Sequence, residues 1–154
     1  MSKFRNFMRR THGNWSSTRR YIYTETNKIT NLRSNINVDF EKEDEDFFYV
    51  KLSWDTSDIE TGKQVSDGEI LTRGTDDKLY RNIGYMTDDG TVCNIDVIDE
   101  DCVVLNTSYN KMRFREEIRL VENDNIRLRQ TLGFKDGEDN PFLVGQYFEE
   151  RVSY

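Results

Sequence analysis

After Gly13, apolar and polar residues alternate along most of this chain. Three segments show the alternation most clearly, and on one face of each lie, in turn, Trp15, Ser17, Arg19, Tyr21 and Tyr23; Phe48, Val50, Leu52 and Trp54; and Leu79, Arg81, Ile83 and Tyr85. Successive side chains of a β-strand point to opposite faces, so residues two apart share a face. The pattern therefore predicts that these segments are strands.

Turn-forming residues separate the strand candidates at regular intervals. They occur as the Asp-Gly pairs at 67–68 and 89–90 and in the segments 99–101, 123–125 and 135–141. The chain holds about ten strand candidates at this spacing, which favours a barrel or sandwich. We expect an all-β, antiparallel up-and-down barrel of roughly eight to ten strands, because closure removes exposed edges and can leave a cavity for one ligand. The acidic run at 41–46 is expected to be a solvated loop.

The first residues follow a different period. Phe7 and Met8 stand three and four residues after Phe4, which is the spacing of one face of an α-helix. The pattern predicts a short amphipathic helix over residues 3–10, placed to close one end of the barrel.

The composition fits one β domain spanning residues 1–154. The chain has no alanine, the strongest helix former, while aromatic residues make up 12% of it and argue against disorder. A formal net charge of −7 makes nucleic acid and an anionic membrane surface unfavourable partners. No run approaches the ~20 apolar residues of a membrane helix, and no apolar signal core opens the chain, which favours the cytoplasm.

Most catalytic and metal-binding patterns are missing from the sequence. His12 is the sole histidine, so a second histidine ligand is not available, and the chain has no phosphate-binding loop or nucleophile motif. Cys93 and Cys102 stand nine residues apart on two strand candidates. We expect both to be small buried hydrophobic residues rather than a disulfide or zinc ligands. No metal site is predicted.

Charged residues on the last three strand candidates leave two interpretations open. At odd-numbered positions lie Arg113, Arg115, Glu117 and Arg119; Arg127 and Arg129; and Tyr147, Glu149 and Arg151. The even-numbered positions are mostly apolar, with Glu116 as an exception. In one interpretation the charged face is solvated and carries weak cross-strand pairs. In the other it lines a polar cavity, where arginines bind an anionic ligand.

Five motifs, in this order, resemble those of a known family. They are GNWSSTRRYIY (13–23), LYRNIGYM (79–86), DDGT leading to LNTSY (88–109), EEIRLVENDNIRLRQT (116–131) and LVGQYFEERV (143–152). Together they resemble the motifs of the S-type (CpcS/CpeS-like) phycobiliprotein lyases. The opening segment carries the family's G-x-W-x-S-x-R pattern. The departures are Asn82, Ile83, Met86 and Gln130, which replace or interrupt commoner residues.

The resemblance implies a ten-stranded, lipocalin-like barrel that holds a bilin, a linear tetrapyrrole, as transferred substrate and not as a prosthetic group. The charged odd-numbered face then becomes the ligand face. Arg127 and Arg129 are expected at the bilin propionates, and Glu117 near the pyrrole nitrogens as the catalytic carboxylate. The further contacts implied are Glu149, Arg151, Arg19, Trp15, Trp54 and Tyr147.

The activity implied is attachment of phycoerythrobilin or phycocyanobilin, through a thioether bond, to a cysteine of a phycobiliprotein α or β subunit. A bilin reductase is the expected donor, and pairing into a homodimer through an apolar outer patch stays open. The expected compartment is the cytoplasm or, in a eukaryote, the plastid stroma. Two alternatives remain: a carrier of a bilin or other amphipathic anion that transfers nothing, and a barrel without a ligand.

Overall fold

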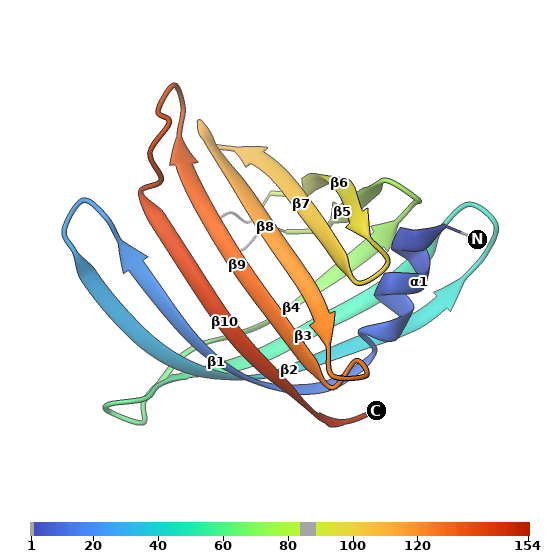
Figure 1. Ribbon diagram of the computed structural model, residues 1–154, viewed down its shortest axis with the longest axis horizontal. Coiled ribbons are helices and arrows are strands. Elements are labelled where there is room, and N and C mark those ends of the chain that lie inside the picture. Colours follow the sequence, from blue (N-terminus) through green and yellow to red (C-terminus); the bar gives the residue numbers. More distant parts are fainter. Residues whose placement is uncertain (1, 84–88) are drawn as a thin grey trace.

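Across residues 2–83 and 89–154, the part of the chain that the structure describes, ten antiparallel strands close into a barrel. The structure is a computed structural model, and Figure 1 shows the strands around one interior with a helix at one end. Each strand pairs with its neighbours in sequence, and β1 pairs with β10 to close the ring. The strands are β1 (Gly13–Tyr23), β2 (Lys28–Glu43), β3 (Phe48–Asp58), β4 (Gln64–Gly74), β5 (Lys78–Arg81), β6 (Thr91–Asp99), β7 (Cys102–Tyr109), β8 (Met112–Val121), β9 (Ile126–Lys135) and β10 (Leu143–Ser153). The predicted up-and-down barrel is confirmed.

The N-terminal helix, α1 (Lys3–Arg10), lies across one end of the barrel (Figure 1). It begins after Ser2, whose side-chain oxygen accepts a hydrogen bond from the Arg5 backbone nitrogen at 2.9 Å, a typical N-cap. Phe4 and Phe7 are fully buried among the barrel residues. The predicted helix and its position are therefore confirmed. In the described residues, no helix is long and apolar enough to cross a membrane.

Apolar side chains fill the half of the barrel next to α1. The buried cluster consists of Phe4, Phe7, Trp15, Ile36, Val38, Phe48, Val50, Leu79, Cys93, Ile95, Val103, Leu105, Ile118 and Leu120. The Phe4 and Phe48 ring centroids lie 5.7 Å apart, and the partly buried Phe40 packs against the cluster with its centroid 5.5 Å from that of Phe48. Cys93 and Cys102 are both buried and free, as expected.

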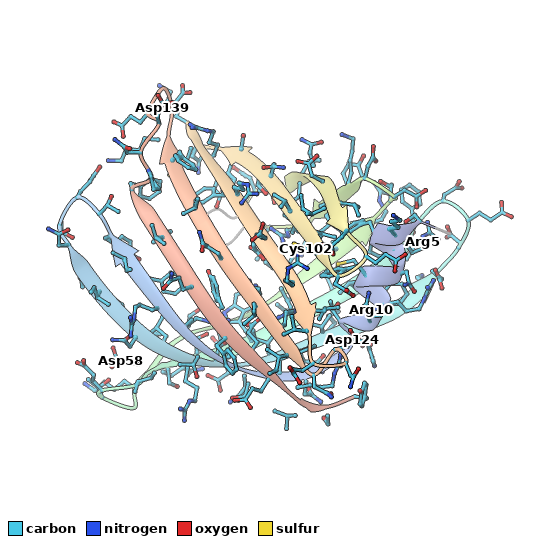
Figure 2. All side chains as sticks on the ribbon, viewed as in Figure 1. Arg5, Arg10, Asp58, Cys102, Asp124 and Asp139 are labelled. Carbon is cyan, nitrogen blue, oxygen red and sulfur yellow. The ribbon has the colours of Figure 1, made fainter. Side chains whose placement is uncertain are left out.

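Two arginines fasten the C-terminal end of α1 to the barrel. The Arg10 guanidinium contacts the carboxylates of Asp101 and Asp124 at 2.6 Å each, and Figure 2 shows Arg10 and Asp124 close together at this end. Arg151 donates hydrogen bonds to the backbone carbonyl of Arg10 at 2.7 Å and to that of Asp124 at 3.1 Å. The hydrogen bond from Arg10 lowers the pKa of Asp124. This end of the barrel is therefore closed by apolar packing and by ion pairs.

The predicted turn at residues 67–68 is wrong, because both residues lie inside β4. Gly68 stands directly opposite Trp54 of β3, and its missing Cβ leaves the space that the indole occupies. The turn between β3 and β4 instead follows Asp58, whose carboxylate accepts a hydrogen bond from the Glu60 backbone nitrogen at 2.8 Å. Gly68 therefore marks close packing within a strand rather than its end.

Two further segments differ from expectation. The strand predicted over residues 79–85 ends at Arg81, where the Asn82 side-chain oxygen, rather than a backbone carbonyl, accepts a hydrogen bond from the Leu71 backbone nitrogen at 2.9 Å. Residues 84–88 lie outside the described residues, and with them Gly84 and Tyr85 of the LYRNIGYM motif. The acidic run at 41–46 is only partly a loop, because β2 continues to its third residue.

Candidate functional site

A cavity of about 410 Å³ occupies the half of the barrel away from α1. Its volume falls in the range of small-molecule sites. It is lined by Arg19, Tyr21, Tyr23, Leu32, Ile36, Leu52, Trp54, Thr56, Val65, Ser66, Arg81, Thr91, Leu105, Thr107, Tyr109, Phe114, Glu116, Arg129, Thr131, Leu143 and Tyr147. Tyr23 and Tyr109 end their strands, so this half opens where α1 does not cover it.

Strands β1, β8, β9 and β10 make the wall of the cavity polar. Arg19, Glu116, Arg129 and Tyr147 all project from them. The guanidinium carbons of Arg19 and Arg129 lie 4.9 and 4.5 Å from the centre of the Tyr147 ring, a distance at which a cation and an aromatic ring attract. The register places Tyr147 between the two arginines, so the ring separates the two positive groups and attracts both at the cavity surface.

Inside the barrel, one step closer to the closed end than Tyr147, the fully buried carboxylate of Glu149 is surrounded by three arginines. Arg127 Nε lies 2.6 Å from Glu149 Oε1, and Arg129 Nη1 lies 3.1 Å from Oε2. Arg19 Nη2 lies 3.6 Å from the same Oε2 atom. On its cavity side Arg129 also contacts Glu116, with Nη2 at 3.1 Å from Oε1. Buried charges need partners of this kind to remain ionised.

The pKa shifts agree with an ionised cluster. Burial alone would raise the pKa of Glu149, but the surrounding guanidinium groups favour its charged form more strongly and lower the pKa to about 2. Burial lowers the pKa of Arg127, yet a guanidinium starts so high that it stays charged at neutral pH. Burial raises the pKa of the Tyr147 phenol, which therefore stays a neutral hydroxyl.

The cavity surface carries more positive than negative charge. Arg19, Arg81 and Arg129 line it, against Glu116 as the carboxylate among the described lining residues. The remaining surface is mainly aliphatic and aromatic. An elongated ligand with an apolar body and carboxylate groups matches this distribution. Among the described residues, no group of three or more histidine, cysteine or acidic side chains is arranged to hold a metal ion.

The expected ligand face is correct in direction for two of its three strands. On β9 and β10 the odd-numbered residues face inward, as expected, and those of β1 do so as well. On β8 the even-numbered residues face inward instead, so Glu116 lines the cavity. Glu117 lies on the outer surface, nearly half exposed and 3.7 Å from Arg115. The expectation that Glu117 faces the ligand must therefore be corrected.

The turn between β8 and β9 explains this reversal. It has four residues, 122–125, and pairs Val121 with Ile126 and Ile118 with Arg129. An even-numbered turn places odd residues of one strand opposite even residues of the next. The polar ENDN run is visible in the sequence, so counting its residues would have identified Glu116.

The other predicted site residues divide into three groups. Arg19, Arg129, Trp54 and Tyr147 line the cavity, while Arg127 and Glu149 are buried beneath its wall. Trp15 and Arg151 are at the closed end, where the guanidinium carbon of Arg151 lies 4.3 Å from the centre of the Trp15 ring. Neither residue lines the cavity, because backbone carbonyls bind Arg151 and Trp15 is part of the apolar cluster.

A closed ten-stranded barrel with one helix-covered end and an arginine-lined cavity has the lipocalin-like architecture. A family model described as CpeS-like protein matches residues 47–152, which is most of the chain. The protein therefore belongs to the CpeS-like family, as the sequence motifs indicated.

Individual proteins agree with this assignment. The chain is 26% identical, over 98% of its own length and 92% of the relative's, to CpcS 2 of Nostoc sp., a candidate phycocyanobilin lyase. It is 28% identical over 66% of its length, and 49% of the relative's, to CpcV of Picosynechococcus sp., a candidate chromophore lyase. The structure of the S-type phycobiliprotein lyase CPES from Guillardia theta has the same fold, with a TM-score of 0.74, 18% identity, and coverage of 100% of this chain and 94% of that one.

Proposed function

We propose that this protein is a phycobiliprotein lyase, which binds a bilin in the barrel cavity and attaches it to a cysteine of a phycobiliprotein subunit. The observation that carries the proposal is the cavity itself, in which Arg19 and Arg129 share one wall and Arg81 lies on another strand, in an otherwise mainly apolar space. A bilin offers the complementary features: an apolar conjugated chain of four rings and two propionates. Membership of the CpeS-like family supports the same activity.

The arginines at the cavity surface bind the propionates. Arg19 and Arg129 present planar guanidinium groups there, which can form paired, charge-assisted hydrogen bonds with carboxylates. Glu149 fixes the position of Arg129 through their ion pair, and Arg127 holds Glu149 in place. This assignment keeps Arg129 as a propionate ligand and gives Arg127 a supporting role.

Glu116 takes the role first expected of Glu117. Its carboxylate reaches the cavity surface and is held in place by Arg129 at 3.1 Å. From there it can accept hydrogen bonds from the pyrrole nitrogens and favour the protonated, cationic bilin. A positive charge on the conjugated system makes its ring-A ethylidene group a better electrophile.

The reaction needs no cysteine of this chain. The acceptor thiol adds across the ethylidene double bond, so its sulfur bonds to the ethylidene carbon and its proton ends on the bilin ring. No group leaves and no oxidant is required. The barrel contributes by holding the flexible bilin in one conformation at the open end, which is catalysis by positioning. Cys93 and Cys102 are buried, and burial raises the pKa of the Cys102 thiol, as suits structural residues.

The test uses free phycoerythrobilin and free phycocyanobilin with the purified protein. Absorbance is recorded first; an apo-phycobiliprotein α or β subunit is then added, and the mixture is denatured and examined for a covalent fluorescent adduct. The expected result is a shifted, sharpened spectrum followed by an adduct that requires the acceptor cysteine. The control is the same mixture without this protein, because bilins react with thiols slowly by themselves.

The other outcomes are informative. A spectral shift without transfer to any subunit would identify a bilin carrier, and no shift with either bilin would contradict the proposal. The same assay with a bilin reductase present tests direct donation, and gel filtration tests the homodimer. Fractionation of the native source distinguishes cytoplasm from plastid stroma.

A further inference from the structure

Trp54 owes its place in the cavity wall to a glycine on the next strand. Gly68 of β4 stands directly opposite Trp54 of β3. A Cβ added at Gly68 would lie 2.7 Å from Cζ2 and 2.9 Å from Cη2 of the indole, closer than any stable contact. Gly68 has an ordinary strand conformation, unlike Gly13, Gly62 and Gly137, whose φ angles are positive. Space for the indole, and not backbone freedom, therefore explains this glycine.

A hydrogen bond fixes the indole in the same place. Trp54 Nε1 donates to Ser66 Oγ at 3.0 Å, and Ser66 also lines the cavity. The bond favours this orientation of the ring, while Gly68 leaves the space in which the ring lies against the strand. Two residues of β4 thus determine where one aromatic ring of the cavity wall sits.

The same pair of strands contains a second arrangement of this kind, in a different environment. Phe48 stands opposite Gly74, and a Cβ there would overlap the Phe48 ring. Phe48 is fully buried between Phe4 and Phe40. Trp54 belongs to the cavity lining. The Phe48–Gly74 pair completes the core, whereas the Trp54–Gly68 pair presents an aromatic ring to the cavity.

We propose that Gly68 and Ser66 are positioning residues that hold Trp54 as a stacking surface for the conjugated rings of the bilin. This inference rests on the proposed function and adds the residues that determine the conformation of the bound bilin. An aromatic ring held at one position favours a parallel bilin ring against it. The absorption of a linear tetrapyrrole depends on how coplanar its rings are, so a displaced indole changes the colour of the complex as well as its affinity.

A double-mutant cycle tests the proposal. Wild type, Gly68→Ala, Trp54→Leu and the double variant are titrated with phycoerythrobilin and phycocyanobilin by absorbance. We expect Gly68→Ala and Trp54→Leu each to weaken binding about five- to tenfold and to move the bound absorption maximum in the same direction. In the Trp54→Leu background, Gly68→Ala should change neither quantity further, because no indole remains to be displaced.

Ser66 and a neighbouring residue supply the matched controls. Ser66→Ala should give a smaller change in the same direction, and Ser66→Thr, which keeps the hydroxyl, should restore the wild-type spectrum. Asp67→Ala, at the exposed position between the two positioning residues, should leave the spectrum unchanged. Thermal unfolding of each apo-protein checks that the variants fold.

Two results would overturn the proposal: a Gly68→Ala protein with wild-type affinity and spectrum, or additive effects in the double variant. Failure of the proposed function is distinguishable, because wild type would then bind neither bilin. The position of the indole is measured in that case from the apo-protein. The part of the tryptophan fluorescence that Trp54→Leu removes is the emission of Trp54. Gly68→Ala should shift the wavelength of that emission, and an unchanged wavelength would contradict the role of Gly68.

Discussion

The closed and open halves of this barrel use arginine differently. At the closed end, Arg151 donates hydrogen bonds to the backbone carbonyls of Arg10 and Asp124. In the open half, Arg129 contacts the side-chain carboxylates of Glu149 and Glu116 and lines the cavity. Backbone carbonyls have fixed positions, so the first arrangement joins parts of the fold. Side-chain carboxylates at a cavity wall instead orient a guanidinium group toward the cavity.

Glu149 stands at the junction of the two halves. It is fully buried and is the shared partner of Arg127, Arg129 and Arg19. The cost of burying these charges is offset only while all of them are paired. The cluster therefore supports the polar wall of the cavity, and it makes the stability of the fold depend on the single carboxylate of Glu149.

The largest expected effect is on stability. Replacing Glu149 with alanine leaves the buried Arg127 without its main partner, and we expect the free energy of unfolding to fall by about 3–5 kcal/mol. The measurement is urea denaturation of the apo-protein. Glu150→Ala, at the next and exposed position of β10, is the control and should change stability by less than about 0.5 kcal/mol. Equal effects of the two variants would refute the role of the cluster.

The pH dependence of stability gives a second test of the cluster. The pKa of Glu149 is lowered from 4.5 to about 2, so its contribution is complete above about pH 5 and is lost as the pH falls toward 2. The contribution is about 3 kcal/mol. Denaturation curves of wild type and Glu149→Gln should therefore converge as the pH falls from 5 to 2. Other carboxylates titrate in both proteins, so the difference isolates Glu149; a constant difference would contradict this prediction.

Ligand affinity separates the two halves directly. Arg129→Ala should weaken bilin binding by about 1.5–3 kcal/mol, since it removes a charge-assisted hydrogen bond to a propionate. Arg151→Ala should lower stability but leave the affinity of the folded protein unchanged. Both are measured by absorbance titration below the unfolding temperature of each variant. A loss of affinity in Arg151→Ala alone would show that the ligand lies at the closed end.

Sequence periodicity was sufficient for the helix and the barrel, because both depend on local alternation, and it grouped the odd-numbered residues of β9 and β10 on one face. The inward direction of that face came from the family resemblance, because alternation alone does not say which face is solvated. Periodicity was not sufficient for Glu117, since the face of β8 depends on the length of the following turn. Arg151 and Trp15 were misplaced because periodicity gives a side chain's face but not its distance from the closed end. Gly68 was taken for a turn, because its reason is a ring on another strand.

The smallest effect, and the sharpest comparison, concerns two adjacent carboxylates. Glu116 faces the cavity and Glu117 faces outward, so the same substitution on neighbouring residues isolates the side of the strand. Glu116→Gln should change the absorption maximum of the bound bilin, because an amide stabilises a protonated tetrapyrrole less than a carboxylate does. Glu117→Gln should leave the spectrum as it is, since Glu117 faces outward and its exposed ion pair with Arg115, at 3.7 Å, contributes little. The reverse result would mean that the bilin contacts the outer surface of the barrel, and the cavity would then have to be given up as its site.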